Sequence, residues 1–299
     1  MNITEFQEKL LQQALQAGLT EAEVYFERKQ SFQCKLHEGA IDSYETSEDG
    51  GLSLRGLYEG KMGYAYTEKL DDDSIAFLID SVKKNASILD EDDGTDIFKG
   101  SSDYAKHSFY NEELETIGIP EKIELLRSIE KKIRTYDPRI VTLDYCIIGQ
   151  FTTERSLMNS KALSLSQKEN GLIIFLSVVV KDGNEMKTAS YRKMTRDFAS
   201  LHEDDIAKAV AEEALANLGE KLIPSGKYPI IIRNDAAASL LAIYSSIFSA
   251  ENAQKNQSLL KGKVGQKVAS DALTLVSDPF HPDALTGSNF DGEGVATKK

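Results

Sequence analysis

Apolar residues in the first ninety positions follow two different spacings. Between residues 3 and 17 they recur every three or four positions, as on the buried face of an amphipathic helix, and Gly18 follows as a helix terminator. From Val24 to Tyr66 apolar and polar residues alternate, which predicts antiparallel strands. A second helical stripe, behind three aspartates that suit a helix N-terminus, runs from Ile75 to Leu89. Turns are predicted at residues 37–40, 48–51 and 59–61.

Residues 90–111 have no regular period and are rich in Asp, Gly and Ser, which indicates a linker whose acidic run 91–93 is a solvated tract. Pro120 then opens a helical stripe that ends before Pro138. A further helix is expected over residues 203–218. Between the two helices, strands are predicted at residues 140–149, 152–158, 162–168, 172–181 and 188–196, with turns at 159–160, 170–171 and 182–184.

The remainder of the chain is less regular. A Pro-Ser-Gly boundary at 224–226 precedes a predicted buried strand at 228–232, an apolar helix at 235–250 and a strand at 272–276. No final helix or strand closes this part, so we expect the chain to be cut off inside it. The fold class predicted is α+β, with antiparallel sheets and flanking helices in two N-terminal units plus the start of a β-rich C-terminal domain. The predicted domains are residues 1–98, an N-terminal α/β meander, 112–220, a central helix-plus-antiparallel-sheet domain, and 226–299, an incomplete C-terminal domain.

Composition narrows the functional classes. The 35 Lys and Arg residues against 48 Asp and Glu give a formal net charge of −13, which disfavours binding to nucleic acid or to an anionic membrane surface. No apolar run has the length of a membrane span, and the first residues do not resemble a signal peptide. Cys34 and Cys146, alone in apolar stretches, are interpreted as buried thiols of a cytoplasmic protein.

The residues that usually carry catalysis form no recognisable constellation. The four histidines, His37, His107, His202 and His281, are too far apart for a helical metal pair. The carboxylates fall in runs of neighbours whose side chains point apart, as at residues 71–73 and 203–205. A glycine pair at 262 and 265 lacks the strand and the terminal Lys-Ser/Thr of a phosphate loop. We therefore predict no catalytic residue in this chain.

Several local phrases resemble the TldD/PmbA family, also called modulators of DNA gyrase. They are Ala-Glu-Val-Tyr at residues 22–25, the Gly-Gly-Leu-Ser-Leu-Arg phrase at 50–55, the Ser-Leu-Leu-Lys-Gly-Lys phrase that opens residues 258–270, and Phe-Asp-Gly-Glu-Gly-Val-Ala-Thr at 290–297. The last two are similar to the PmbA branch. Family members continue past this point with a further β-rich portion.

The resemblance implies a cytoplasmic heterodimer. In such a pair, a TldD-type subunit holds zinc through a His-Glu-x-x-x-His helix and a later cysteine, and cleaves peptides or unfolded proteins. A PmbA-type subunit, also called TldE, lacks the metal and helps to form the substrate passage. The family is linked to peptide-antibiotic maturation and antitoxin degradation. In the alignment that the resemblance implies, Ala242, Ile243 and Ile247 occupy the positions of the two zinc histidines and the catalytic glutamate of this motif. Their side chains cannot bind zinc. The resemblance therefore implies a non-catalytic subunit without a cofactor of its own, with zinc expected in a TldD-type partner.

Alternative interpretations stay open. The first is a stand-alone regulatory module that binds peptides or proteins without cleaving them and forms a homodimer when alone. The second, direct action on gyrase or DNA, fits poorly with the acidic charge. The loop containing Phe290, Asp291, Glu293 and Gly294 is a candidate contact for a peptide amine or for the partner subunit. The alternative interpretation is that this loop only forms a turn at a domain border.

Overall fold

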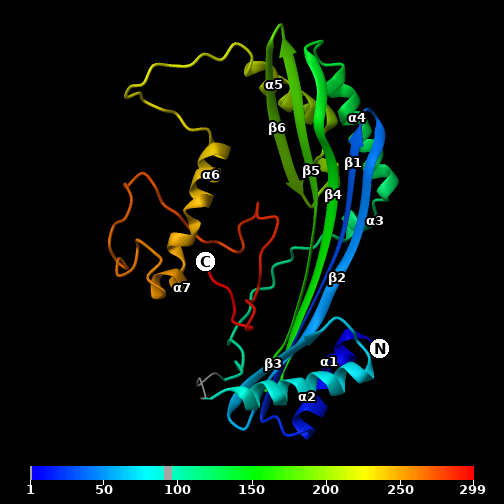
Figure 1. Cartoon of the computed structure of the whole chain (residues 1–299), viewed down its shortest axis with the longest axis vertical. Coiled ribbons are helices and arrows are strands. Elements are labelled where there is room, and N and C mark those ends of the chain that lie inside the picture. Colours follow the sequence, from blue (N-terminus) through cyan, green and yellow to red (C-terminus); the bar gives the residue numbers. More distant parts are fainter. Residues whose placement is uncertain (1, 91–95) are drawn as a thin grey trace. The chain divides into compact units, whose positions relative to one another are not determined.

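A single antiparallel sheet organises the larger part of the molecule. A computed structural model describes residues 2–90 and 96–299. The sheet has six strands in the order β3-β2-β1-β4-β5-β6 (Figure 1). The strands are β1 (Glu21–His37), β2 (Ala40–Tyr58), β3 (Lys61–Thr67), β4 (Ile140–Asn159), β5 (Ser164–Asp182) and β6 (Glu185–Thr195). The predicted α+β class is confirmed, and one sheet passes through both N-terminal units.

The strands are longer than the sequence pattern predicts, because two predicted turns are wrong. Residues 48–51 lie inside β2, where a Cβ on Gly50 would be 2.6 Å from the carbonyl oxygen of Glu27. Residues 170–171 lie inside β5, where a Cβ on Gly171 would be 2.9 Å from the Phe151 ring. These glycines permit close approach within the sheet, which is the other common use of glycine in a strand. As a result, the runs 140–149 and 152–158 are one strand, and so are 162–168 and 172–181.

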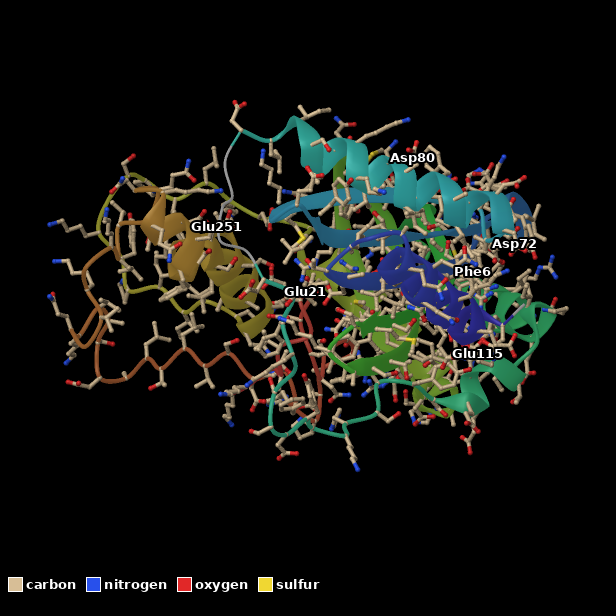
Figure 2. The ribbon with its side chains drawn as sticks, turned by 90° about the horizontal axis from the view of Figure 1, so that it is seen from below. Phe6, Glu21, Asp72, Asp80, Glu115 and Glu251 are labelled. Carbon is tan, nitrogen blue, oxygen red and sulfur yellow. The ribbon has the colours of Figure 1, made fainter. Side chains whose placement is uncertain are left out.

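Two pairs of helices cover one face of this sheet. Helices α1 (Ile3–Gln16) and α2 (Asp72–Ile88) pack on the even-numbered residues near the start of β1, such as Val24 and Phe26. Phe6 of α1 is buried there, while Asp72 and Asp80 of α2 are exposed (Figure 2). Helix α4 (Ile119–Arg134) packs against β1 and β4, and helix α5 (Glu203–Ala216) packs against β5 and β6, in a core that includes the even-numbered residues near the end of β1. Since side chains alternate along a strand, both pairs lie on the same face.

The segment between the two helical pairs is partly packed. Residues 91–95, which include the predicted acidic run, lie outside the described residues. In the part that follows, Ile97 and Phe109 are fully buried, and Phe109 forms a parallel bridge to Glu169 of β5. The short helix α3 (Glu112–Thr116) then leads into α4, and a 3-10 turn (Phe198–Ser200) precedes α5. The predicted buried thiols are confirmed: Cys34 and Cys146 are buried and free.

Residues 221–277 form a second compact unit, separate from the unit made of residues up to 220 and 278–299. It contains α6 (Asn234–Ile243), a 3-10 turn (Ser245–Phe248) and α7 (Ala250–Gln254), so the predicted helix 235–250 is interrupted at Tyr244. The predicted strands at 228–232 and 272–276 are wrong, and Ile231 is 99% exposed rather than buried. An apolar run forms a strand only where another strand pairs with it, and residues 221–277 contain none. The three predicted domain boundaries stay a prediction.

Candidate binding site

The last part of the chain crosses the sheet face that the helices leave uncovered. Residues 285–297, here called the strap, lie against odd-numbered residues of β4 and β5 such as Arg155 and Gln167. The carbonyl oxygen of Gly287 accepts a hydrogen bond from the Gln167 amide at 2.8 Å. Near the other end, the Ala296 amide donates to the Ser101 hydroxyl at 3.0 Å. The strap is therefore held along its length.

Phe290 is the apolar anchor of the strap. Its side chain is 1% exposed and packs in a small cluster with Leu157 and Leu163. The guanidinium of Arg155 lies over the ring, 5.3 Å from the centroid. A buried aromatic ring with a cation on its face combines apolar burial with a cation–π contact. The predicted contact residue Phe290 therefore faces the protein rather than solvent.

Asn289 holds the neighbouring position through its side-chain amide and its backbone. Its side-chain oxygen accepts from the His107 backbone amide at 3.2 Å, and its side-chain nitrogen donates to the His107 carbonyl at 2.9 Å. Its own backbone amide donates to the Gln167 side chain at 2.9 Å. This pairing ties the strap to residues 104–108, more than 180 positions earlier in the chain.

The acidic residues of the predicted contact loop have different surroundings. The Asp291 carboxylate accepts from the backbone amides of Glu293 and Val295, so it stabilises the turn itself. Glu293 is exposed, with its carboxylate 3.6 Å from Arg55 of β2. Gly294 has a φ of +82°, and a Cβ there would be 2.8 Å from Leu163. Asp291 and Glu293 are both exposed, but the Asp291 carboxylate already accepts two backbone hydrogen bonds within the turn, whereas the Glu293 carboxylate does not.

Two open cavities adjoin the strap. One has a volume of about 440 Å³ and lies between β5 and residues 104–108, with Asn289 and Phe290 in its wall. The other, of about 420 Å³, is lined by Glu23, Tyr25, Ser53, Arg55, Tyr64 and Gly292. Sequence reasoning missed this second group, although its signal was present: polar residues occupy the alternate positions of β1 and β2 that point away from the core.

Electrostatics in the second cavity centre on Glu23 and Arg55. Glu23 is 3% exposed, and the two side chains form an ion pair of 2.7 Å. Burial raises the pKa of Glu23 above its ordinary value, while Arg55 and Asn159 act in the opposite direction. Burial and the neighbouring Glu27 carboxylate raise the pKa of Tyr25 to about 12, so its phenol stays protonated at neutral pH. The lining supplies hydrogen-bond donors, acceptors and a guanidinium, which are groups that can bind a polar ligand.

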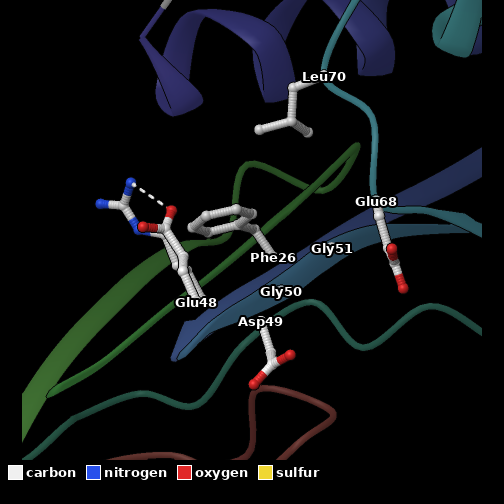
Figure 3. A pocket seen from close by; sticks show the side chains of 8 residues that line it. Phe26, Glu48, Asp49, Gly50, Gly51, Glu68 and Leu70 are labelled. Carbon is white, nitrogen blue, oxygen red and sulfur yellow. Dashed lines mark ion pairs between the residues drawn. The ribbon is translucent and has the colours of Figure 1, made fainter. Parts of the chain in front are cut away.

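A third cavity, of about 340 Å³, lies beside the Gly50–Gly51 stretch of β2 (Figure 3). Its charged lining is mostly acidic, with Glu48, Asp49 and Glu68 around it. Arg28, the one cation among the described lining residues, pairs with Glu48 at 4.0 Å. Among the described residues, no three His, Cys, Asp or Glu side chains are grouped closely enough to hold a metal ion. None of the described helices combines the length and apolar character that a membrane crossing requires.

Three family models together match most of the chain. They describe PmbA/TldA metallopeptidase domain 1 at residues 22–86, the central domain at 112–218 and the C-terminal domain at 225–299. The chain belongs to the PmbA/TldD metallopeptidase family. The resemblance found in the sequence is confirmed.

Relatives of both named types are similar to this chain. A metalloprotease PmbA homolog from Buchnera aphidicola is 22% identical over 92% of this chain and 62% of its own length. A metalloprotease TldD homolog from Haemophilus influenzae is 24% identical over 93% of this chain and 59% of its own length. A Thermotoga maritima crystal structure, named as a modulator of a DNA gyrase, is 28% identical with a TM-score of 0.90, over 99% of this chain and 67% of that one. The chain thus spans about three fifths of the length of these curated relatives.

The residues that the sequence resemblance predicts at the positions of the zinc motif lie in the second unit. Ala242 and Ile243 are the last residues of α6, and Ile247 is in the 3-10 turn that follows. Ile243 is 73% exposed, and none of the three side chains carries a nitrogen, oxygen or sulfur atom. Zinc in proteins is bound through side-chain nitrogen, oxygen or sulfur atoms. These residues do not fit the metal that the family name implies.

Proposed function

We propose that this chain is the non-catalytic, metal-free subunit of a PmbA/TldD-type metallopeptidase that acts on peptides or unfolded proteins in the cytoplasm. The proposal is supported by the side chains of Ala242, Ile243 and Ile247, which carry no metal-binding atom at the positions where the resemblance predicts the zinc ligands and the catalytic glutamate. A shift of the alignment does not restore a ligand, because no histidine occurs between His202 and His281.

The proposed partner is a TldD-type subunit that carries the zinc. Relatives named PmbA and TldD match this chain at similar identity, so the assignment to one branch rests on the residues and not on the matches. In the proposed complex, this chain contributes binding surface. The strap and the cavity around Glu23 and Arg55 support that role, because both present polar groups that can pair with a peptide main chain.

Co-purification tests the proposal. The protein is expressed with a TldD-type subunit from the same genome, and cleavage of an unfolded peptide is measured with each subunit alone, with both, and with both plus a chelator. We expect cleavage only with both subunits, and its loss with the chelator. A His→Ala change in the partner's zinc motif is the matched control, since it should abolish cleavage without preventing association. If the partner alone cleaves the peptide as fast as both subunits together, the proposal that this chain is a required subunit is contradicted.

The stand-alone peptide-binding interpretation is favoured by one observation, the open polar cavity of about 420 Å³ on a sheet face without a predicted catalytic group. A genome that encodes this chain but no chain with a His-Glu-x-x-x-His helix would support it. In that case an unfolded peptide should bind the isolated chain, and Arg55→Ala should weaken the binding while Lys84→Ala on the exposed side of α2 should not.

A further inference from the structure

Strand β2 has a long edge that no other strand of the described residues covers. Strand β3 pairs only with its last seven residues, Leu52–Tyr58, although β2 is nineteen residues long. Residues 40–51, which precede that part, pair with β1 on one side only, and nearly all of them are exposed. This stretch, residues 40–51, is called the free edge below. Long exposed edges are templates for pairing with another chain, and proteins usually block them with lysine, proline or a covering loop.

The backbone groups that point outward from the free edge follow from the register. Tyr58 and Lys61 flank the two-residue turn between β2 and β3, so they exchange hydrogen bonds. In an antiparallel ladder every second residue does the same, so beyond the bulge opposite Lys35 and Leu36 the even-numbered residues of β2 direct their amides and carbonyls away from β1. In the free edge these are Tyr44, Thr46, Glu48 and Gly50. Each has a strand-directed donor and acceptor with no neighbouring strand among the described residues.

The charged side chains of the free edge are all negative. Asp42, Glu45, Glu48 and Asp49 are its ionisable carboxylates, and it contains no lysine, arginine or proline. Lys35 of β1 pairs with Asp42 at 2.7 Å, and Arg28 is 4.0 Å from Glu48. Glu45 and Asp49 have no ion pair with the described residues. A strand that docks here therefore meets an edge that is itself only acidic, and the cations beside it, Lys35, Arg28 and Lys29, belong to β1.

This charge decides against a second copy of the chain as the occupant. Two free edges paired with one another would bring eight carboxylates together without a lysine or arginine between them. Like charges on directly opposed strands destabilise the pairing, and opposite charges stabilise it. The complementary occupant is an extended segment with lysine or arginine side chains.

We propose that the free edge of β2 docks an extended, cationic strand of the metal-bearing partner subunit, adding a seventh strand to the sheet. Main-chain hydrogen bonds to Tyr44, Thr46 and Glu48 give the register, and the carboxylates of Glu45 and Asp49 select a positively charged strand. The identity of the partner rests on the function proposed above, whereas the edge and its charge preference do not.

The test removes one backbone N–H group that points outward from the free edge. Thr46→Pro deletes the central donor, and its ring points to the outer side, where an edge strand tolerates proline. Thr46→Val keeps the amide and is the matched control. Glu45→Lys together with Asp49→Lys reverses the charge. Each variant is first compared with the unchanged protein by thermal melting, and affinity for the zinc-bearing subunit is then measured at low and high salt.

We expect Thr46→Pro to weaken binding of the subunit by about tenfold or more, which is the loss of one well-placed hydrogen bond plus steric exclusion. Thr46→Val should bind as the unchanged protein does. The double lysine variant should bind more weakly and lose its sensitivity to salt. Unchanged affinity in a folded Thr46→Pro variant would overturn the docking edge, while leaving the two-subunit function in place.

Two labelled peptides of about ten residues separate the edge from the proposed function. One alternates lysine with valine and the other alternates glutamate with valine, and their fluorescence anisotropy is measured with the chain alone. Binding of the lysine peptide, lost in Thr46→Pro, supports the edge even if no subunit is captured. Equal binding of both peptides contradicts the charge preference. Self-association of the chain that Thr46→Pro abolishes would show that a second copy is the occupant and would overturn the proposal.

Discussion

Replacement of Phe290 with alanine should release the strap without unfolding the sheet. The ring is 1% exposed, so a burial of about 200 Å² at about 25 cal/mol per Å² corresponds to roughly 5 kcal/mol. Phe→Ala changes in protein cores cost about 3–5 kcal/mol. The cluster around Phe290 is separate from the two larger cores, so the loss falls on docking of the strap rather than on global stability.

A loss of about 4 kcal/mol corresponds to roughly a thousandfold shift in the docking equilibrium. Hydrogen exchange measures this shift at the backbone amides of Asn289 and Ala296. These amides donate from the strap to the side chains of Gln167 and Ser101. Both amides should exchange up to about a thousandfold faster in Phe290→Ala, and much less so in Phe290→Leu, the matched control. The melting temperature of the sheet should change little. Unchanged exchange at both amides would refute the claim that Phe290 anchors the strap.

Other predictions concern parts of the sheet and its helices. Gly63→Ala should destabilise the fold by more than about 2 kcal/mol in urea unfolding, because its Cβ would lie 2.0 Å from the Val82 carbonyl oxygen of α2, a clash of the overpacking kind. Asn170→Ala should cost about 2–3 kcal/mol in the same assay, since this fully buried side chain makes three hydrogen bonds, two of them to the backbone amide and carbonyl of Asn111, which would lose this partner. Hydrogen bonds from Arg139 lower the pKa of Asp137 to about 2. This contact therefore stabilises the folded state at pH values above the unfolded pKa of about 3.9, and its contribution is lost as the pH falls towards 2. An NMR titration should find that Arg139→Ala returns the Asp137 pKa towards 3.8, and no change would contradict the assigned cause.

The parts of the fold that depend on near neighbours could be predicted from the sequence. The four main helices, the antiparallel strands and the turns at residues 37–40, 59–61 and 182–184 all follow from local spacing. Gly50 and Gly171 were misjudged because a glycine marks either a turn or a close approach, and the chain that approaches is distant in sequence. The same limit explains residues 228–232, where an apolar run has no strand to pair with in its own unit.

The candidate site was only partly accessible to sequence reasoning. The phrase that contains Phe290 and Glu293 identified the family, but the burial of Phe290 depends on Leu157 and Leu163, more than 120 positions earlier. Glu23 and Arg55 meet because β1 and β2 pair in a register that puts them opposite one another. A pattern of alternating polar residues indicated an outer face, but not that the strap crosses it.

Metal content is the most direct measure of the central claim, that this chain is the metal-free subunit of its family's peptidase. The protein is purified with every residue its gene encodes, dialysed against zinc, and analysed for bound metal and for peptide cleavage. We predict far less than one equivalent of zinc and no cleavage until a TldD-type subunit is added. One equivalent of tightly bound zinc, with chelator-sensitive cleavage by this chain alone, would contradict the account.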